Sequence, residues 1–444
     1  MSTVFALSSG RGRAAIAVVR VTGPRAGTAL AALTDALPPP RAAKPSRLTA
    51  VDGRAIDAAL VLWFPGPASA TGEDVAEFHV HGGPAVVECL LTELGALPGL
   101  IPAEPGEFTR RAFQNGKLDL TQVEALADTI AAETEAQRVQ AVRQLEGELG
   151  RLVEYWREEV LRALAHVEAA IDFAEDDLPA DVAAAAEARV RRLIPQMDKS
   201  VHDAVRGECL RGGVQAVLLG APNVGKSSVF NRLARRDAAI VSPTAGTTRD
   251  VVEVHLDLSG APLLLADTAG LREIGDQIEG EGMRRAVARA EDADLKLALF
   301  DATAWPVTDA ATRAHVDGKT VIVVNKTDLV GGPPPGSAIL DGRPVRFVSA
   351  RTGAGFEELL ALLETEVAAR TGLTEEPGLS RARHREALAA SAGHLRGFLE
   401  DAAAPLELRA EELRLAARAL GRITGRVGVE DMLDFVFSEF CIGK

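Results

Sequence analysis

The feature that most limits the possible folds is the loop from Gly220 to Ser227, whose sequence GAPNVGKS fits the phosphate-loop pattern. An apolar strand is predicted before it, at Gln215 to Leu219, and a helix after it, at Ser228 to Leu233. In such a unit the glycines let backbone N–H groups converge on phosphates, Lys226 neutralises their oxygens and the Ser227 hydroxyl ligates Mg²⁺. The loop therefore predicts a doubly wound α/β module that binds a nucleoside triphosphate.

The motif Asp267-Thr268-Ala269-Gly270 follows a second predicted apolar strand, Leu263 to Ala266. At this strand end the Asp267 carboxylate can hold Mg²⁺, and the N–H of the flexible Gly270 can follow the γ-phosphate. This combination is typical of a segment that changes conformation with the state of the nucleotide.

The motif Asn325-Lys326-Thr327-Asp328 ends a third predicted strand, Thr320 to Val324. The Asp328 carboxylate can accept hydrogen bonds from N1–H and the exocyclic amine of guanine, two donors that adenine does not present there. Each four-residue motif alone could be an ordinary turn, but the three motifs occur in this order at strand ends. The sequence therefore favours GTP over ATP.

The composition is that of a folded protein without features of export. Of 444 residues, 47% are hydrophobic and 25% are charged, and no apolar run approaches the ~20 residues that span a bilayer. Cys89, Cys209 and Cys441 lack the spacing of a disulfide framework or a zinc site, which favours the reducing cytoplasm. The 49 basic and 63 acidic residues give a net charge of −14, which disfavours strong nucleic-acid binding by the chain alone.

The hydrophobic pattern divides the chain into four stretches. Residues 1–116 predict an α+β domain with short strands at Ala14 to Val21, Ala59 to Phe64 and Glu77 to Val80. Residues 117–212 show helical spacing and end in a glycine-containing linker, predicted at Arg206 to Gly213. Residues 213–370 alternate strands and helices, and residues 371–444 return to helical spacing, with one face formed by Leu413, Ala416, Leu420 and Ile423. The simplest architecture is a multidomain chain whose α/β module is inserted into one α-helical domain.

These motifs, together with Gly246-Thr247-Thr248-Arg249 and Ser349-Ala350-Arg351, resemble the translation-factor class of P-loop GTPases, and essentially the whole chain resembles the MnmE (TrmE) family of tRNA-modification GTPases. The resemblance implies a Ras-like GTPase module, with Mg²⁺ held by Ser227 and Thr248 and guanine contacted by the Ser-Ala-Arg loop. It implies GTP-binding positions at Asn223, Val224, Gly225, Lys226, Ser227, Ser228, Ser242, Pro243, Thr244, Ala245, Gly246, Thr247, Thr248, Asp267, Thr268, Ala269, Gly270, Asn325, Lys326, Asp328, Ser349, Ala350 and Arg351.

Leu271, which follows the second motif, cannot orient water as a glutamine there would. The family resemblance implies that Glu279 orients the water instead, and that K⁺ supplies positive charge and supports a contact between two modules, so that hydrolysis depends on dimerisation. The K⁺ ligands implied are Asn223, Ser242, Thr244 and Thr247. The alternatives are that Glu279 is a solvated acid in an acidic stretch and that Asn223 caps a turn.

The resemblance also implies a tetrahydrofolate derivative (5-formyl or 5,10-methylene) bound by Arg20, Glu77, Lys117 and Lys444. Without the resemblance, a strand-capping Arg20 and surface ion pairs of Glu77 and Lys117 are the preferred interpretation. His79 and His81 share a strand face, but no third metal ligand follows, which favours structural histidines. Cys441, in the C-terminal signature of the family, is either a nucleophile or a packing residue.

The resulting expectation is a cytoplasmic, homodimeric GTPase, not membrane-bound, that modifies C5 of the wobble uridine of certain tRNAs with a one-carbon unit from tetrahydrofolate. The resemblance implies a partner that carries FAD, MnmG, in a heterotetramer, and this partner would provide most of the tRNA affinity. The basic cluster from Arg381 to Arg385 is a weaker alternative tRNA contact. Two other classes stay open: an assembly GTPase, for example one acting on ribosomes, and a dimeric scaffold whose shape the GTPase controls.

Overall fold

The computed structural model describes residues 2–172, 181–235, 239–240, 253–266, 291, 293–333, 338–372, 378–400 and 404–427, and near the C-terminus residues 433, 436–437, 440 and 442–443. The chain divides into two compact units. The first comprises Met1–Ala127, Gln144–Val190 and His394–Lys444, and the second comprises Asp128–Arg143 and Arg191–Gly393. None of the helices in the described ranges combines the length and the apolar character needed to cross a membrane.

The N-terminal part of the first unit is a mixed sheet with strand order β3-β4-β5-β2-β1-β6. Its strands are β1 (Thr3–Leu7), β2 (Ala14–Thr22), β3 (Lys44–Thr49), β4 (Ala55–Phe64), β5 (Val75–Gly82) and β6 (Leu100–Pro102). The three predicted strands lie within β2, β4 and β5 and are confirmed. All neighbouring pairs are antiparallel except β1 and β6.

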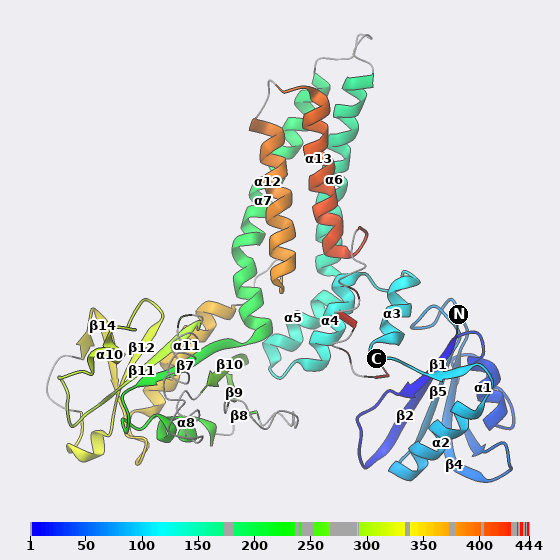
Figure 1. The fold of residues 1–444 in the computed structure, drawn as a ribbon, viewed down its shortest axis with the longest axis horizontal. Coiled ribbons are helices and arrows are strands. Elements are labelled where there is room, and N and C mark those ends of the chain that lie inside the picture. Colours follow the sequence, from blue (N-terminus) through cyan, green and yellow to red (C-terminus); the bar gives the residue numbers. More distant parts are fainter. Residues whose placement is uncertain are drawn as a thin grey trace, which may run out of the picture. The chain divides into compact units, whose positions relative to one another are not determined.

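Helices α1 (Ala26–Leu33) and α2 (Pro84–Ala96) cover one face of this sheet (Figure 1). Because side chains alternate along a strand, Val19 and Phe78 point into the core with Leu30 and Leu90, and all four are fully buried. The opposite face carries the residues between these positions, among them Arg20 on β2 and Glu77 on β5, which are register partners. The predicted folate residues of this domain therefore lie on the face away from α1 and α2.

The helical part is built from segments on both sides of the α/β module. Helix α3 (Glu107–Gln114) precedes it in the N-terminal part, and its helices are α4 (Leu120–Ala131), α5 (Glu135–Leu145), α6 (Glu148–Asp172), α7 (Asp181–Gly212), α12 (Ala382–Glu400) and α13 (Leu406–Thr424). Helices α6 and α13 lie side by side (Figure 1), with ion pairs Arg414–Glu168 and Arg426–Glu154 along their contact. The predicted apolar face of α13, with Leu413 and Leu420, is buried. This packing confirms that the module is inserted into one helical assembly.

The linker predicted at Arg206 to Gly213 is wrong for most of its length, because α7 continues to Gly212. Gly207 is a helical residue, and a Cβ at this position would overlap the backbone carbonyl oxygen of Leu379. The glycine therefore permits a close approach between α7 and the chain before α12, and does not end the helix.

The α/β module has a sheet with strand order β13-β14-β12-β11-β7-β10-β9-β8. Its strands are β7 (Val214–Gly220), β8 (Ala239–Ile240), β9 (Glu253–Leu258), β10 (Ala261–Ala266), β11 (Leu295–Asp301), β12 (Thr320–Asn325), β13 (Ile339–Leu340) and β14 (Arg343–Phe347). Strands β10, β7, β11, β12 and β14 are parallel, and β9 is antiparallel to β10. The predicted doubly wound α/β module is confirmed, with its parallel strands ending at one edge.

Helices of this module include α8 (Lys226–Ala234), α10 (Ala310–Arg313) and α11 (Phe356–Thr371), with a 3₁₀ turn, η2, at Thr327–Leu329. Val229, Leu233, Leu359 and Leu363 from α8 and α11 pack against Leu218 and Leu297 of the central strands. In such a sheet, ligands bind outside the carboxyl ends of the strands. A ligand-binding site is therefore expected at the loops after β7, β12 and β14.

Candidate nucleotide-binding site

The phosphate loop joins the end of β7 to the start of α8, as its sequence predicts. Asn223 and Gly225 both adopt the left-handed backbone conformation, with φ of 61° and 98°. The Lys226 ammonium donates hydrogen bonds to the carbonyl oxygens of Gly220 (2.7 Å) and Ala221 (2.9 Å). Ser227 and Ser228 are exposed in the first turn of α8, where the free N–H groups and the helix dipole favour an anion.

Asn325 connects the phosphate loop to the Ser-Ala-Arg loop. Its side-chain amide donates to the carbonyl oxygen of Val224 (3.1 Å), and its amide oxygen accepts the backbone N–H of Ala350 (3.0 Å). Asn325 is buried, so these bonds are protected from water. Three motifs far apart in the sequence are thereby held at one strand edge.

Asp328 lies at the end of this arrangement, where its carboxylate faces two side chains of the Ser-Ala-Arg loop. The Ser349 hydroxyl donates to Oδ1 (2.6 Å), and Nε of Arg351 lies 2.9 Å from Oδ2. The hydrogen bond from Ser349, together with the Arg351 charge, holds the pKa of Asp328 below its usual value. The carboxylate is therefore ionised and able to accept two donors from a guanine edge.

Lys326 has a left-handed backbone, with φ of 70°, and its ammonium lies 2.7 Å from Oδ2 of Asp301 at the end of β11. Burial alone would raise the pKa of Asp301, but hydrogen bonds from Lys326 and Thr303 outweigh burial and lower it. Asp301 is not among the residues predicted from the sequence, although an acidic residue at the carboxyl end of a parallel strand is a signal for such a position.

Several predicted site residues lie outside the described ranges. These are Ser242, Pro243, Thr244, Ala245, Gly246, Thr247, Thr248, Asp267, Thr268, Ala269, Gly270, Glu279, Cys441 and Lys444. Of the implied cation ligands, the described residues are Ser227 for Mg²⁺ and Asn223 for K⁺, and both side chains are exposed on the phosphate loop. Their hydroxyl and amide oxygens suit hard cations.

In the N-terminal domain, the structure brings Arg20 and Glu77 together. Nη2 of Arg20 lies 2.8 Å from Oε1 of Glu77, and Nε2 of His79 lies 3.0 Å from Oε2. The Arg20 guanidinium also lies over the ring of Phe108, 5.9 Å from its centroid. Burial would raise the pKa of Glu77, but the hydrogen bond from His79 and the charge of Arg20 lower it overall. Lys117 is exposed in the turn after α3.

The two histidines considered as a metal pair face different carboxylates. His79 contacts Glu77, whereas Nδ1 of His81 lies 2.8 Å from Oδ1 of Asp57. The basic cluster after residue 380 is likewise paired, because Arg381 lies 2.8 Å from Asp128 and Arg385 lies 2.8 Å from Glu208. These ion pairs reduce the positive charge that Arg381 and Arg385 can offer to tRNA.

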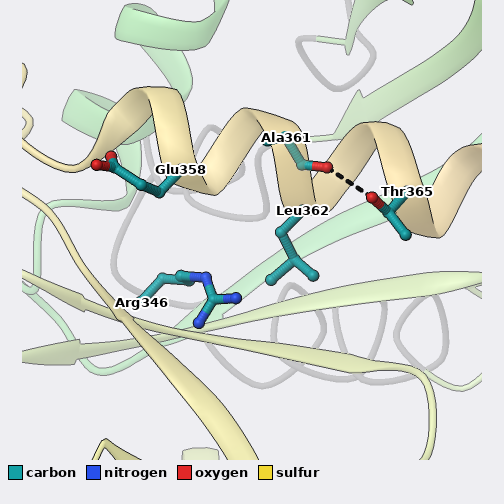
Figure 2. Close-up of a pocket in the computed structure, with 5 residues that line it drawn as sticks. All are labelled: Arg346, Glu358, Ala361, Leu362 and Thr365. Atoms are coloured by element: carbon teal, nitrogen blue, oxygen red, sulfur yellow. Dashed lines mark hydrogen bonds between the residues drawn. The ribbon is translucent and has the colours of Figure 1, made fainter.

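Figure 2 shows an open groove of about 470 Å³ between α11 and β14, lined by Arg346, Glu358, Ala361, Leu362 and Thr365. The Thr365 hydroxyl donates to the carbonyl oxygen of Ala361 (2.8 Å), one turn earlier in α11. None of the predicted site residues lines this groove. The groove is therefore separate from the guanine-facing cluster.

Comparison with known proteins covers the whole chain. Residues 3–117 match the model of the GTP-binding protein TrmE N-terminus, and residues 120–441 match the model of the MnmE helical domain. The chain is 54% identical to the tRNA modification GTPase MnmE of Paramagnetospirillum magneticum, over 100% of this chain and 99% of the relative. It is 50% identical to the human mitochondrial 5-taurinomethyluridine-[tRNA] synthase subunit GTPB3, over 100% of this chain and 93% of the relative. The chain therefore belongs to the MnmE (TrmE) family of GTPases.

Proposed function

We propose that this chain hydrolyses GTP and couples the hydrolysis to modification at C5 of the wobble uridine of certain tRNAs, in the cytoplasm. The observation that carries the GTP part is the Asp328 carboxylate, ionised and oriented by Ser349 and Arg351 beside the phosphate loop. The tRNA part is supported by the names of the relatives, of which one is a tRNA modification GTPase and one a 5-taurinomethyluridine-[tRNA] synthase subunit. The group added is of the carboxymethylaminomethyl type.

In GTP binding, Lys226 and Asp328 would exchange hydrogen-bond partners within the protein for groups of the nucleotide. Lys226 would move from the carbonyl oxygens of Gly220 and Ala221 to the β- and γ-phosphates, which carry more charge. Asp328 would accept N1–H and the exocyclic amine of guanine. Ser227, with Thr248, would hold Mg²⁺. A bound Mg²⁺ ion would neutralise the charge that develops on the phosphates during hydrolysis.

For hydrolysis, Glu279 would orient the attacking water. Asn223, Ser242, Thr244 and Thr247 would hold K⁺, whose positive charge stabilises the transition state when bound. Asn223 is exposed on a left-handed turn of the phosphate loop, which supports this role, because solvent and a cation can reach an exposed amide oxygen. Two modules would meet across this cation, so hydrolysis would require dimerisation.

The modification would use a tetrahydrofolate derivative held by the cluster of Arg20 and Glu77, with Lys117 and Lys444. A half-buried carboxylate beside a guanidinium suits a pterin edge, and the cations suit the glutamate tail. Cys441 would lie with this ligand. The FAD-containing partner MnmG would supply tRNA affinity, because the chain itself carries a net charge of −14.

A homodimer through the N-terminal sheet is part of the same proposal. On the face away from α1 and α2, Ile16 is 61% exposed and Leu60 is 37% exposed. A second copy that covered these two side chains would remove apolar surface from water, which favours association. The predicted domains, residues 1–116, 117–212, 213–370 and 371–444, complete the proposed organisation.

The proposal is tested by mass spectrometry of wobble-uridine nucleosides from cells that lack this chain, with rescue by wild type, Glu279→Ala, Asp328→Asn and Cys441→Ser. Loss of the C5-modified uridine, restored by wild type but not by Glu279→Ala, is the expected result. Full restoration by Cys441→Ser would remove the thiol from the mechanism. An unchanged nucleoside profile in the deletion would overturn the modification function and favour an assembly GTPase.

A further inference from the structure

Arg232 on α8 belongs to none of the nucleotide motifs, yet it connects the phosphate-loop helix to the Ser-Ala-Arg loop. Its Nη1 donates to the carbonyl oxygens of Ala350 (3.0 Å) and Arg351 (3.4 Å), and its Nη2 donates to that of Thr352 (3.3 Å). Its guanidinium also lies over the ring of Phe356, the first residue of α11, 5.4 Å from the centroid. One side chain thus contacts three consecutive carbonyl groups and the next helix.

The backbone of the loop is shaped to admit this guanidinium. Gly353 has φ of 93°, and a Cβ at that position would overlap Nη2 of Arg232. The turn is closed by hydrogen bonds from the N–H of Gly353 to the Ser349 carbonyl (2.8 Å) and from the N–H of Thr352 to the Ser349 hydroxyl (3.1 Å). Three carbonyl dipoles that converge on one point repel one another, and a cation at that point stabilises them.

The other side of the same loop faces the guanine-binding carboxylate. Ser349 and Arg351 contact Asp328, while the N–H of Ala350 contacts Asn325. Arg232 therefore holds residues 350–352 from one side, and the loop holds Asp328 from the other. Arg232 donates to the backbone carbonyl groups of the loop. The effect of Arg232 on Asp328 must therefore pass through Ser349 and Arg351.

We propose that Arg232 is a positioning residue for guanine specificity, which acts through the Ser-Ala-Arg loop on the Asp328 carboxylate. The inference rests on the proposed binding of guanine nucleotides. It would also link the two ends of the nucleotide, because Arg232 lies on the same helix as Lys226 and Ser227, which would contact the phosphates in the proposed function. The planar guanidinium is required, since a lysine ammonium cannot donate to three carbonyls and stack on Phe356 at once.

The test compares equilibrium binding of GDP and IDP to the full-length wild type, Arg232→Met, Arg232→Lys and the control Arg235→Met. IDP lacks the exocyclic amine, so the ratio of the two affinities reports how well Asp328 is placed. We expect Arg232→Met to reduce this ratio about tenfold, because the exocyclic amine of guanine would lose its oriented hydrogen bond to the charged Asp328 carboxylate. Arg232→Lys should reduce it less, and Arg235→Met, an exposed cation at the end of α8, should leave it unchanged.

A role that is only structural would lower GDP and IDP affinity equally and leave the ratio at the wild-type value, and this result would overturn the proposal. The double variant Arg232→Met/Asp328→Asn gives a second readout. If Arg232 acts through Asp328, the double variant should show the same ratio of GDP to IDP affinity as Asp328→Asn alone. Should Arg232→Met not fold, Arg232→Lys decides by the same ratio. A wild type that fails to discriminate GDP from IDP would instead overturn the proposed guanine-nucleotide function itself.

Discussion

Nδ1 of His255 on β9 lies 2.6 Å from Oε2 of Glu133, in the segment between α4 and α5. A backbone hydrogen bond beside it runs from the N–H of Ala136 to the carbonyl oxygen of Gly260 (3.0 Å), in the turn between β9 and β10. In the sequence, the β9–β10 hairpin lies between two of the predicted motifs, Gly246-Thr247-Thr248-Arg249 and Asp267-Thr268-Ala269-Gly270. The chain between α4 and α5, together with the start of α5, is therefore hydrogen-bonded to the strand pair that lies between these two motifs.

Glu133→Ala should loosen this attachment. Both side chains are partly exposed, so we expect a loss of roughly 1 kcal/mol in the local free energy of opening. Hydrogen exchange of the Ala136 amide should become several-fold faster, because its bond to Gly260 loses its neighbouring support. Glu135→Ala is the matched control, since Glu135 pairs with Arg138 at the surface of α5. Equal exchange at Ala136 in wild type and Glu133→Ala would show that the His255 contact does not hold the hairpin.

Gly225→Ala should weaken GTP binding strongly, although the substitution adds only one methyl group. The residue has φ of 98°, and a Cβ there would overlap the side-chain amide of Asn325. The substitution forces Asn325 away from Val224 and Ala350, and we expect a cost of roughly 2 kcal/mol or more from backbone strain and lost hydrogen bonds. GTP affinity, measured by calorimetry, should fall at least tenfold. Gly212→Ala, at a position with open space around it, should bind GTP as wild type does; equal affinities for all three proteins would contradict the close packing at Gly225.

The sequence predicts the α/β module well because its signals are local. The strand before the phosphate loop and the helix after it have apolar periods and a glycine-rich turn between them, and both are confirmed as β7 and α8. A prediction from local signals is wrong at Gly207. This glycine is predicted to be part of a linker, but it lies inside α7, where it permits a close contact with the backbone of Leu379. Arg232 could not be found this way, because its acceptors are backbone carbonyls more than a hundred residues away that carry no side-chain signature.

The ion pair between Lys296 and Asp317 should make the α/β module sensitive to acid. Lys296 is 7% exposed on β11, and its ammonium lies 2.7 Å from Asp317, which is 45% exposed. Burial would raise the pKa of Asp317, but hydrogen bonds from Lys296, Lys319 and Thr320 lower it to about 2. Because the folded-state pKa lies below the unfolded value, the pair stabilises the fold above about pH 4. This stabilisation is lost as the pH falls toward about 2.

Asp317→Asn should therefore destabilise the module at pH 6 by about 1 kcal/mol, a value limited by the solvent exposure of Asp317. The difference from wild type should shrink as the pH falls toward about 2, where the wild-type carboxyl is protonated too. Hydrogen exchange of β11 amides measures this effect within the module. Asp341→Asn, which breaks an exposed pair with Arg313, is the control and should change these amides less. A difference between Asp317→Asn and wild type that is constant with pH would contradict the assignment.

Glu77→Gln tests whether the Arg20–Glu77 cluster binds a ligand or only stabilises the sheet. The substitution keeps the size of the side chain but removes the charge that faces Arg20 and His79. If the carboxylate accepts hydrogen bonds from a pterin, affinity for 5-formyl-tetrahydrofolate should fall at least tenfold in calorimetry, with GTP affinity unchanged. His81→Gln, on the same strand but paired with Asp57, is the matched control and should bind as wild type does. If Glu77→Gln lowers the stability of the N-terminal domain and leaves folate affinity unchanged, the cluster is a cross-strand ion pair, and the ligand must be sought elsewhere.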